Sequence, residues 1–438
     1  MKASRLPAWG VTLALAGTMV ACTTSSSPVA DPVAPDPVRS NTVATVYAAR
    51  SFKAAILTCS PDEVTVANYL KAQSAIRYPL VQITIIPVII PPDLTSASGA
   101  VEFTTLFAAV TAAIGPKEAA QGGRFDMIQL LHQFPHHVSW GAAKPGASCG
   151  VSTDNRWSVE SILAAGFDAK AASDSPPSFS IGTNIIPWKG AVDISANWRL
   201  MYLVTRLEGH TIAEVNAKID RACAPASATR PGVIIDGPGK NGTSNNGAGY
   251  TYWENTWFAD GVNKVTSQGN TFGYSTKNDM IGYTGDSNAN NSDDASEMPA
   301  AAWTYQTSST FPVGYLLSFG LHSNGNGSMG PGFTSPSQYA NLPFSSRSVI
   351  LGGESFSAYA LDGSHPGYGG TTLGQWLALN SAGFIGPKNE PCATGIDTGL
   401  FTKLYCGQNL TFAEAAHASF HTTKGIYSPF GVAWMTLR

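Results

Sequence analysis

The chain has 438 residues, a formal net charge of −3 and no run of basic residues. This composition excludes the electrostatic footprint of a nucleic-acid-binding protein, so we expect no nucleic acid as a partner. Charged residues make up only 13% of the chain, which is typical of an exported protein with long polar loops. The roughly 400 residues after the first 42 exceed the size of one ordinary hydrophobic core. We therefore expect two α/β subdomains, residues 43–230 and 231–438.

The N-terminal segment predicts export. Lys2 and Arg5 precede the uncharged apolar run 8–21, which is too short to span a membrane stably and is typical of a signal peptide, residues 1–21. Met19-Val20-Ala21-Cys22 resembles a lipobox, which predicts lipidation of Cys22 and a membrane anchor; ordinary cleavage near Ala21 is the alternative. The Ser-, Thr-, Pro- and Asp-rich segment 22–42 predicts a flexible tether. We expect a periplasmic or outer-membrane lipoprotein.

Five cysteines follow Cys22, and none forms a CxxC pair, so a zinc knuckle or a thioredoxin-like site is not expected. Outside the cytoplasm, disulfides are the default state of cysteine. Cys392 and Cys406 close a short loop and are the best candidate pair. Cys149 and Cys223 are a second candidate pair, which leaves Cys59 unpaired.

The first half of the chain alternates predicted strands and helices. Residues 53–59, 81–90 and 125–131 are apolar runs that predict buried strands, and the segments between them, near 62–76 and 100–114, have helical periodicity. This order predicts a parallel sheet covered on both faces.

The pattern continues after a long polar stretch. Residues 200–207 predict a strand, Thr211 and Glu214 form a capping box before a helix, and residues 232–235 predict the next strand. A second capping box, Thr411 to Glu414, predicts a helix through about Ser419. The final apolar run, 431–437, predicts a strand that closes a sheet.

Seven stretches together resemble a family of secreted bacterial proteins of unknown function that are distantly similar to gingipain-type peptidases of the caspase–hemoglobinase fold. They are residues 66–83, 124–135, 201–222, 232–236, 354–358, 383–391 and 407–420. The resemblance implies an α/β fold of two Rossmann-like subdomains with mainly parallel sheets. It implies no reaction, because fold alone does not determine function.

The peptidases of that fold use a His-Gly after one strand and a Cys after the next. The matching positions here hold Gly285-Asp286, at the end of a predicted strand 279–286, and Glu354-Ser355, at the end of a predicted strand 348–355. The Cys/His dyad is therefore expected to be absent. The leading hypothesis is a ligand-binding protein with a degenerate peptidase-like fold.

Ser355 is a candidate nucleophile. It lies in the sequence Gly353-x-Ser355-x-Ser357 after a predicted strand, which resembles a nucleophile elbow except for its last residue. A serine needs a base, and the histidines that follow are His365, His417 and His421, with Asp397 available to orient one of them. This pattern predicts a serine hydrolase, an esterase or a peptidase. In the alternative reading, Ser355 caps a helix.

The acidic loop 286–297 is a candidate calcium site. Asp286, Asn288, Asn290 and Glu297 fall at positions 1, 3, 5 and 12 of a calcium-loop pattern, and their oxygen atoms can surround a hard cation. Asn291 replaces the usual glycine at position 6, so an EF-hand is not expected. The alternatives are a looser calcium site and a solvated loop without metal.

Carboxylates at strand ends suggest a ligand-binding cleft. Asp236 ends a predicted strand, where ligands of open α/β sheets bind, and Glu354 and Glu390 can join it if their strands share that edge. The bound ligand would be an envelope polysaccharide or a peptide, and a structural envelope component is the third hypothesis.

Two further groups of charged and polar residues lie at strand ends in the first half. Arg206 and Glu208 predict a structural ion pair. His132, His136 and His137 do not match the HExxH zinc motif, so a zinc-protease site is not expected.

Overall fold

The structure is a computed structural model, in which the residues from Ser40 to Arg438 form one compact unit. It describes residues 51–90, 100–139, 156–165, 202–225, 232–236, 315–319, 346–352, 357–359, 361, 373–378, 381–388, 401, 404–405, 409–419 and 427–437. Among these residues, no helix is long and apolar enough to cross a membrane.

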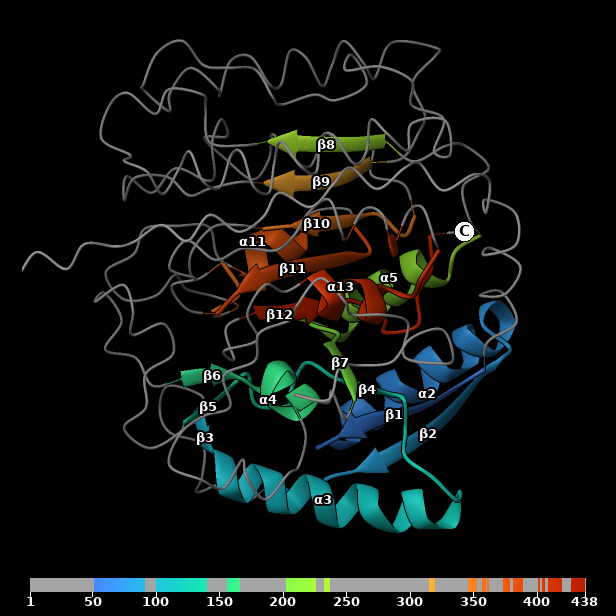
Figure 1. Cartoon of the computed structure of the whole chain (residues 1–438), viewed down its shortest axis with the longest axis vertical. Helices are drawn as coiled ribbons and strands as arrows, with labels where there is room; N and C mark the ends of the chain where they lie inside the picture. Colours follow the sequence, from blue (N-terminus) through green and yellow to red (C-terminus); the bar gives the residue numbers. More distant parts are fainter. Residues whose placement is uncertain are drawn as a thin grey trace, which may run out of the picture. The chain divides into compact units, whose positions relative to one another are not determined.

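A nine-stranded sheet organises the described residues. Its strand order is β2-β1-β4-β7-β12-β11-β10-β9-β8, which can be followed in Figure 1 from β2 at the bottom to β8 at the top. The strands are β1 (Phe52–Thr58), β2 (Val81–Pro87), β4 (Met127–Leu130), β7 (Leu203–Arg206), β8 (Gly232–Asp236), β9 (Tyr315–Phe319), β10 (Val349–Leu351), β11 (Gly383–Pro387) and β12 (Tyr427–Phe430). The expected α/β fold with mainly parallel strands is confirmed.

The two halves of this sheet run in opposite directions. Strands β1, β2, β4 and β7 are parallel to one another, and so are β8, β9, β10 and β11. β12 lies between the two sets; it is parallel to β7, with Phe430 beside Arg206, and antiparallel to β11, with Phe430 beside Phe384. The carboxyl ends of the two sets therefore lie at opposite edges of the sheet.

The first half follows the predicted alternation of strands and helices. β1 is joined to β2 by α2 (Pro61–Arg77), β2 to β4 by β3 (Ala100–Glu102) and α3 (Phe103–Ala120), and β7 is followed by α5 (Ile212–Cys223). Since the chain moves outward from β1 to β2 and back to β4, the right-handed crossover rule places α2 and α3 on opposite faces. α2 and α5 pack together, and the Tyr78 hydroxyl donates to the Ala222 carbonyl at 2.6 Å.

Capping explains where the main helices begin. Ser60 is the N-cap of α2 and accepts a hydrogen bond from the amide of Glu63, while Pro61 supplies the fixed φ that suits the first helical position. The two predicted N-caps are confirmed, because Thr211 accepts from the Glu214 amide at the start of α5 and Thr411 accepts from the Glu414 amide at the start of α13 (Phe412–Ser419). The box at Thr411 is complete, since Glu414 accepts from the Thr411 amide, whereas Glu214 accepts from the neighbouring His210 amide.

Smaller elements accompany this framework. A three-stranded sheet has the order β3-β5-β6, with β5 at His137–Ser139 and β6 at Arg156–Ser158. β6 leads directly into α4 (Val159–Ala165), which packs on β7 and β12, and α11 (Leu373–Ala378) lies beside β11.

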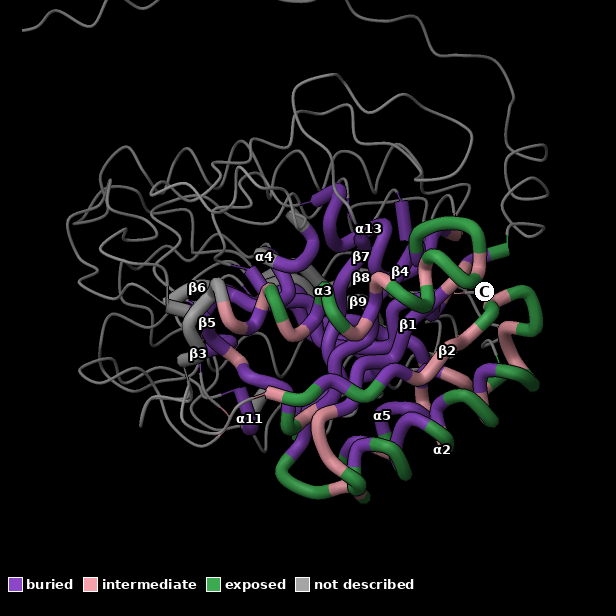
Figure 2. The backbone as a smooth tube through the Cα atoms, turned by 90° about the horizontal axis from the view of Figure 1, so that it is seen from below, coloured by how far each residue is buried: buried purple, intermediate pink, exposed green. Residues whose placement is uncertain are grey.

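The core is centred on the inner strands of the first half. β4 and β7 are buried throughout and β1 is buried except at Lys53, whereas the outward side of α2 is exposed, as Figure 2 shows. Ala54, Ala55, Ile56 and Leu57 are all fully buried, as expected for an inner parallel strand covered on both faces. Burial of a side chain such as Ile56 contributes about 1.5–3 kcal/mol to stability.

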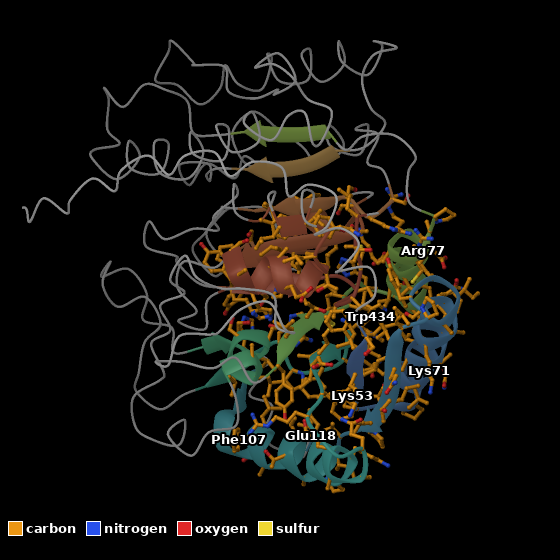
Figure 3. The ribbon with its side chains drawn as sticks, turned by 45° about the vertical axis from the view of Figure 1, so that its right-hand side comes forward. Lys53, Lys71, Arg77, Phe107, Glu118 and Trp434 are labelled. Carbon is orange, nitrogen blue, oxygen red and sulfur yellow. The ribbon has the colours of Figure 1, made fainter. Side chains whose placement is uncertain are left out.

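The C-terminal tail corrects one prediction. The last described strand is β12, and residues 431–437 form a turn and an irregular segment instead of a strand. Trp434 is buried and its indole N–H donates to Ser74 of α2 at 3.0 Å; Figure 3 shows it pointing among the side chains between the sheet and α2. The prediction was wrong because a short apolar run has the same pattern in a buried tail as in a buried strand.

Two of the five cysteines after Cys22 lie among the described residues. Cys59 and Cys223 are free thiols in the part of the chain that the structure describes. Cys149, the predicted partner of Cys223, lies outside that part, so the Cys149–Cys223 pair stays a prediction. Cys59 was expected to be unpaired. Cys392 and Cys406 lie outside the described residues, as does Cys149.

Candidate functional site

One edge of the sheet collects the chain segments that follow β1, β4 and β7. These adjacent strands are parallel, so Cys59, His132 and Glu208, which come just after them, belong to the same edge. Ligands of α/β sheets bind at such edges, particularly where the strand order reverses, which here is between β1 and β4.

At the carboxyl ends of β1 and β4, where the strand order reverses, lies a side chain of the protein itself. Glu63, in the first turn of α2, is fully buried. One of its carboxylate oxygens accepts from the Cys59 amide at 2.6 Å, and the other accepts from the Gln133 amide at 2.7 Å. These amides, which in a nucleotide-binding loop would face a phosphate group, are satisfied by Glu63. A phosphate-binding role is therefore not supported at this point.

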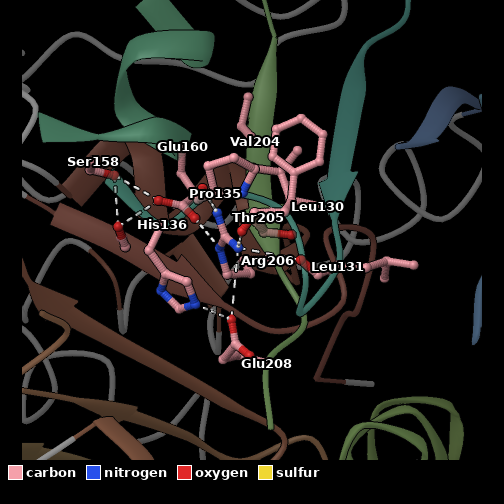
Figure 4. Close-up of polar contacts among 12 residues, drawn as sticks. Leu130, Leu131, Pro135, His136, Ser158, Glu160, Val204, Thr205, Arg206 and Glu208 are labelled. Atoms are coloured by element: carbon pink, nitrogen blue, oxygen red, sulfur yellow. Dashed lines mark hydrogen bonds and ion pairs between the residues drawn. The ribbon is translucent and has the colours of Figure 1, made fainter. Parts of the chain in front are cut away.

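Next to it, at the end of β7, lies a buried ion pair. Arg206 and Glu160 of α4 are both completely buried, and Arg206 Nε donates to a Glu160 oxygen. The rest of the guanidinium donates to backbone carbonyls of the segment after β4: Leu131 at 3.3 Å, Phe134 at 2.6 Å and Pro135 at 2.6 Å. Figure 4 shows the guanidinium at the centre of these contacts. Arg206 thereby fixes the backbone on which His132 and His136 are carried.

Glu160 joins the two halves of the sheet. Its second oxygen accepts from Ser158 at 2.8 Å and Ser428 of β12 at 2.7 Å, and lies 3.3 Å from Nζ of Lys388, which follows β11. Burial tends to raise the pKa of Glu160, but Arg206 and Lys388 outweigh this and hold the pKa well below its usual value. Burial lowers the pKa of Lys388 to about 8, in spite of the opposing effect of Glu160. Glu160 is therefore a permanent anion between two cations.

A second carboxylate, Glu208, pairs with a histidine. Glu208 Oε2 lies 2.7 Å from His136 Nε2 and 3.7 Å from the nearest Arg206 nitrogen, and Oε1 accepts from the Gly209 amide at 3.1 Å. Burial raises the pKa of Glu208 to about 7, whereas burial together with Arg206 and Lys388 lowers the pKa of His136 well below its usual value. Both shifts favour the neutral forms of the two groups.

Two imidazole nitrogens at this edge lack hydrogen-bond partners in the described part of the chain. They are Nδ1 of His132 and Nδ1 of His136, and both atoms are buried. Glu208 Oε2, although 2.7 Å from His136 Nε2, also has no hydrogen-bond partner among the described residues. A buried polar atom without a partner costs about 1–3 kcal/mol, so such atoms call for an explanation. The His136 side chain as a whole is 22% exposed, whereas Glu208 is covered. This edge thus combines an acid–base pair with access from solvent, and we call residues His132, His136 and Glu208 the histidine edge.

Several predicted site residues can now be placed. Ser355, Asp397 and His421 lie outside the described residues. His417 is buried in α13, and its Nε2 lies 2.8 Å from the carbonyl oxygen and 3.1 Å from the amide nitrogen of Val204 in β7. Burial lowers the pKa of His417 to about 4. These contacts indicate that His417 ties α13 to β7, which is a structural role.

The predicted carboxylate cleft belongs to the other edge. Asp236 ends β8, and β8, β9, β10 and β11 are parallel, so the carboxyl ends of these strands share one edge. Glu354 and Glu390 lie outside the described residues. So does the predicted calcium loop with Asp286, Asn288, Asn290 and Glu297, as does the predicted lipidation site Cys22. Among the described residues, no group of three potential ligands is arranged to hold a metal ion.

The main partner of Arg206 is Glu160 and not, as predicted, Glu208. Glu160 receives the direct hydrogen bond, and Glu208 lies farther away beside His136. Sequence reasoning missed Glu160 and Lys388, which are 46 and 182 positions from Arg206 in the sequence (206 − 160 and 388 − 206). No local pattern marks them. The sequence offered one signal: Glu160 and Lys388 are charged residues within or beside short apolar segments. A charged residue in such a place is buried only when it is paired.

Comparison with known proteins identifies no family. No protein-family model matches the chain, and no curated protein matches it. A solved structure described as "Structure of Protease" is similar with a TM-score of 0.47 and 9% sequence identity, over 88% of this chain and 78% of that chain. A similarity of this extent assigns no activity to the chain.

Proposed function

We propose that the chain is an exported, lipid-anchored protein whose folded part binds a hydrogen-bonding ligand of the cell envelope, a peptide or a polysaccharide. In this proposal the fold is peptidase-like but lacks the Cys/His dyad. The observation that carries the proposal is the His136–Glu208 pair, 2.7 Å apart at the carboxyl edge of β4 and β7. There a partly exposed imidazole lies on a backbone that the buried Arg206 holds in place.

The chemistry of the neighbouring thiol supports binding over cysteine-dependent hydrolysis. Cys59 follows β1 at the same edge, but burial and the adjacent Glu63 raise its pKa to about 12. A cysteine acts as a nucleophile as the thiolate, which this environment disfavours at neutral pH. The imidazole of His136 is paired with Glu208.

The test is binding of envelope fragments to the full chain in detergent micelles. Soluble peptidoglycan fragments and soluble envelope polysaccharide are titrated in separate calorimetric experiments. We expect one of them to bind, and His136→Ala to lose at least tenfold in affinity. His210→Ala is the matched control, because His210 is exposed at the start of α5 and its role in capping is through its backbone amide.

Each outcome either supports the proposal or overturns it. Binding that His136→Ala weakens and His210→Ala leaves unchanged supports the proposal. Failure of folded protein to bind either polymer, or equal binding by all three proteins, overturns it. Circular dichroism of each variant establishes that the protein is folded.

The anchor is tested in producing cells. We expect a clickable palmitate analogue to label the wild-type chain and to leave Cys22→Ser unlabelled, with the variant released from the membrane fraction. Palmitate incorporation that persists in Cys22→Ser would show that the lipid is attached elsewhere.

A further inference from the structure

β2 is the outermost strand on one side of the nine-stranded sheet, and in the part of the chain that the structure describes it pairs with β1 alone. Figure 2, which is seen from below, shows it between α2 and α3, with intermediate and exposed residues along its length. Proteins commonly protect an edge strand with charged side chains, because its unpaired backbone groups otherwise bind another strand. β2 has no charged residue, so its edge is suited to pairing.

The hydrogen bonds to β1 identify the backbone groups of β2 that point outward. The Leu80 carbonyl accepts from β1 at 3.2 Å and the Val88 amide donates to β1 at 2.7 Å, so the even-numbered residues of this segment face β1. Because the direction of these groups alternates along a strand, the amide and carbonyl groups of Ile83 and Ile85 point away from β1. Among the described residues, no strand lies on that side to pair with them.

An antiparallel copy of β2 matches these groups. When a two-fold axis passes through Thr84, Ile83 of each copy lies opposite Ile85 of the other, and each such pair exchanges two N–H···O=C bonds. Pro87, which has no N–H, then lies opposite Val81, whose amide already donates to a carbonyl of the preceding turn at 2.9 Å. The two residues that cannot offer an amide in this register therefore face each other.

The same register matches the side chains. Ile83 and Ile85 become cross-strand neighbours on one face of the sheet, and Thr84 meets its own copy on the other face. Pairs of β-branched residues and pairs of threonines are favourable in these positions. At each end of the paired strands, Leu80 of one copy lies beside Ile89 of the other. These two side chains are 45% and 87% exposed, so the pairing removes apolar surface from water.

The two α2 helices become neighbours on one face of the joined sheet. α2 packs on both β1 and β2, so its axis lies about half a strand spacing inward from β2. With strands about 4.8 Å apart, the two helices are about 10 Å apart, which is a normal packing distance. α2 and β2 are also of nearly equal length, about 25 Å and about 23 Å, so the axis passes near the middle of both. The helices run antiparallel, which brings their dipoles into a favourable arrangement.

The side of α2 that faces this axis is complementary to itself. α5 packs on the opposite side, where it bonds to Tyr69, and the row away from α5 consists of exposed residues at spacings of four, three and four: Val64, Asn68, Lys71 and Ala75. In the antiparallel pair, Val64 lies opposite Ala75, and Lys71 lies opposite Asn68. The Asn68 side chain donates its N–H to the Val64 carbonyl at 2.9 Å, which leaves its amide oxygen to accept from Lys71 of the other copy.

We propose that the chain forms a two-fold symmetric homodimer in which the β2 strands of two copies pair antiparallel about Thr84 and the two α2 helices pack side by side. A free peptide strand could use the same backbone groups, but it would leave the row on α2 uncovered, whereas a second copy covers both. This interface goes beyond the proposed ligand binding at the histidine edge and does not depend on it.

Thr84→Cys tests the position of the axis. The two substituted residues form a non-hydrogen-bonded pair with Cα atoms about 4.5 Å apart, which is within reach of a disulfide. Gln82→Cys is the matched control, because Gln82 is exposed in the same strand but lies about 14 Å from its copy in this register. After mild oxidation of the full chain in detergent, we expect Thr84→Cys to run mainly as a covalent dimer in non-reducing electrophoresis. The wild-type chain and Gln82→Cys are expected to remain monomeric there.

Sedimentation equilibrium in density-matched detergent, with more micelles than chains, measures the association itself. We expect the wild-type chain to be a dimer. Thr84→Lys places two like charges directly opposite each other and is expected to raise the dissociation constant at least tenfold. Ile76→Lys is the control for a general loss of apolar surface, because Ile76 is 82% exposed on α2 outside the row that faces the axis. It is expected to leave the dissociation constant unchanged.

The results that overturn the proposal are specific. A wild-type chain that sediments as a monomer overturns it, and so does equal cross-linking of Thr84→Cys and Gln82→Cys. If Ile76→Lys weakens association as much as Thr84→Lys, the copies associate through general apolar contact and the assigned interface is wrong. A monomeric chain that binds a synthetic peptide of residues 80–88 would show that the edge accepts a free strand and not a second copy. Circular dichroism establishes that each variant is folded, and if Thr84→Lys is not, the cross-linking result decides.

Discussion

Arg206 at the end of β7 donates to the Glu160 carboxylate of α4 in an ion pair from which solvent is fully excluded. The pair connects four parts of the chain, because Glu160 also contacts Ser428 of β12 and Lys388 beyond β11. Each charge is compensated only as long as all partners are present. Loss of one partner leaves a buried charge unpaired, which is far more costly than loss of an exposed pair.

Glu160→Gln is therefore expected to lower the free energy of unfolding by about 3–5 kcal/mol. The amide has the same shape, so the loss reports the uncompensated charges of Arg206 and Lys388 and not a cavity. Urea unfolding followed by circular dichroism measures it. Asp62→Asn is the matched control, since Asp62 is exposed in the first turn of α2 and is expected to cost about 0.3–1 kcal/mol. Equal effects of the two substitutions would contradict a central role for Glu160.

His417 predicts a loss of stability in acid. Burial lowers its pKa to about 4 in the folded protein, below the value of about 6.5 in an unfolded chain. The unfolded state therefore binds the proton more readily, and stability falls as the pH drops from about 6.5 to 4, by about 3 kcal/mol for this one group. His417→Gln is expected to remove one proton from the pH dependence of the unfolding free energy in that interval. An unchanged slope in the variant would show that other groups determine acid stability.

The framework of the first half was predictable because its signals are local. Buried strands have apolar sequences, and the N-cap at Thr211 marks the start of a helix by residue type and spacing alone, as Thr411 does in the second half. The tail after β12 was predicted wrongly as a strand. Its burial depends on a contact between Trp434 and Ser74 across 360 positions, which no local pattern encodes.

The candidate site was only partly predictable for the same reason. The histidines after β4 and the Arg206–Glu208 segment were recognisable as strand-end residues, but the partner of Arg206 was not. The reversal of strand direction at β12 also depends on the order of strands in space. Because the strand direction reverses there, Glu208 and Asp236 follow or end strands whose carboxyl ends lie at opposite edges of the sheet. The sequence alone therefore gives no ground for placing both carboxylates in one cleft.

Gly386 of β11 is packed so closely that an added methyl group is expected to lower the stability of the fold. A Cβ atom at Gly386 would lie 2.6 Å from both the Phe384 ring and the Ser357 hydroxyl. Gly386→Ala is expected to destabilise the fold by about 1–3 kcal/mol, because both neighbours are buried. Gly115→Ala is the control, since its Cβ would meet nothing within 4 Å in α3, and alanine favours the helix by about 0.5–1 kcal/mol. Thermal unfolding should move in opposite directions for the two variants.

The serine-hydrolase alternative leads to a final prediction. His417 was one of the bases considered for Ser355, but its Nε2 is held at the Val204 backbone and its lowered pKa makes it a weak base. A serine without an activated base reacts poorly with fluorophosphonates, which modify nucleophilic hydroxyl groups. We therefore expect the full chain, folded in detergent, not to be labelled by a fluorophosphonate probe. Labelling that disappears in Ser355→Ala and persists in His417→Gln would instead identify a hydrolase in which another residue, such as His421, serves as the base.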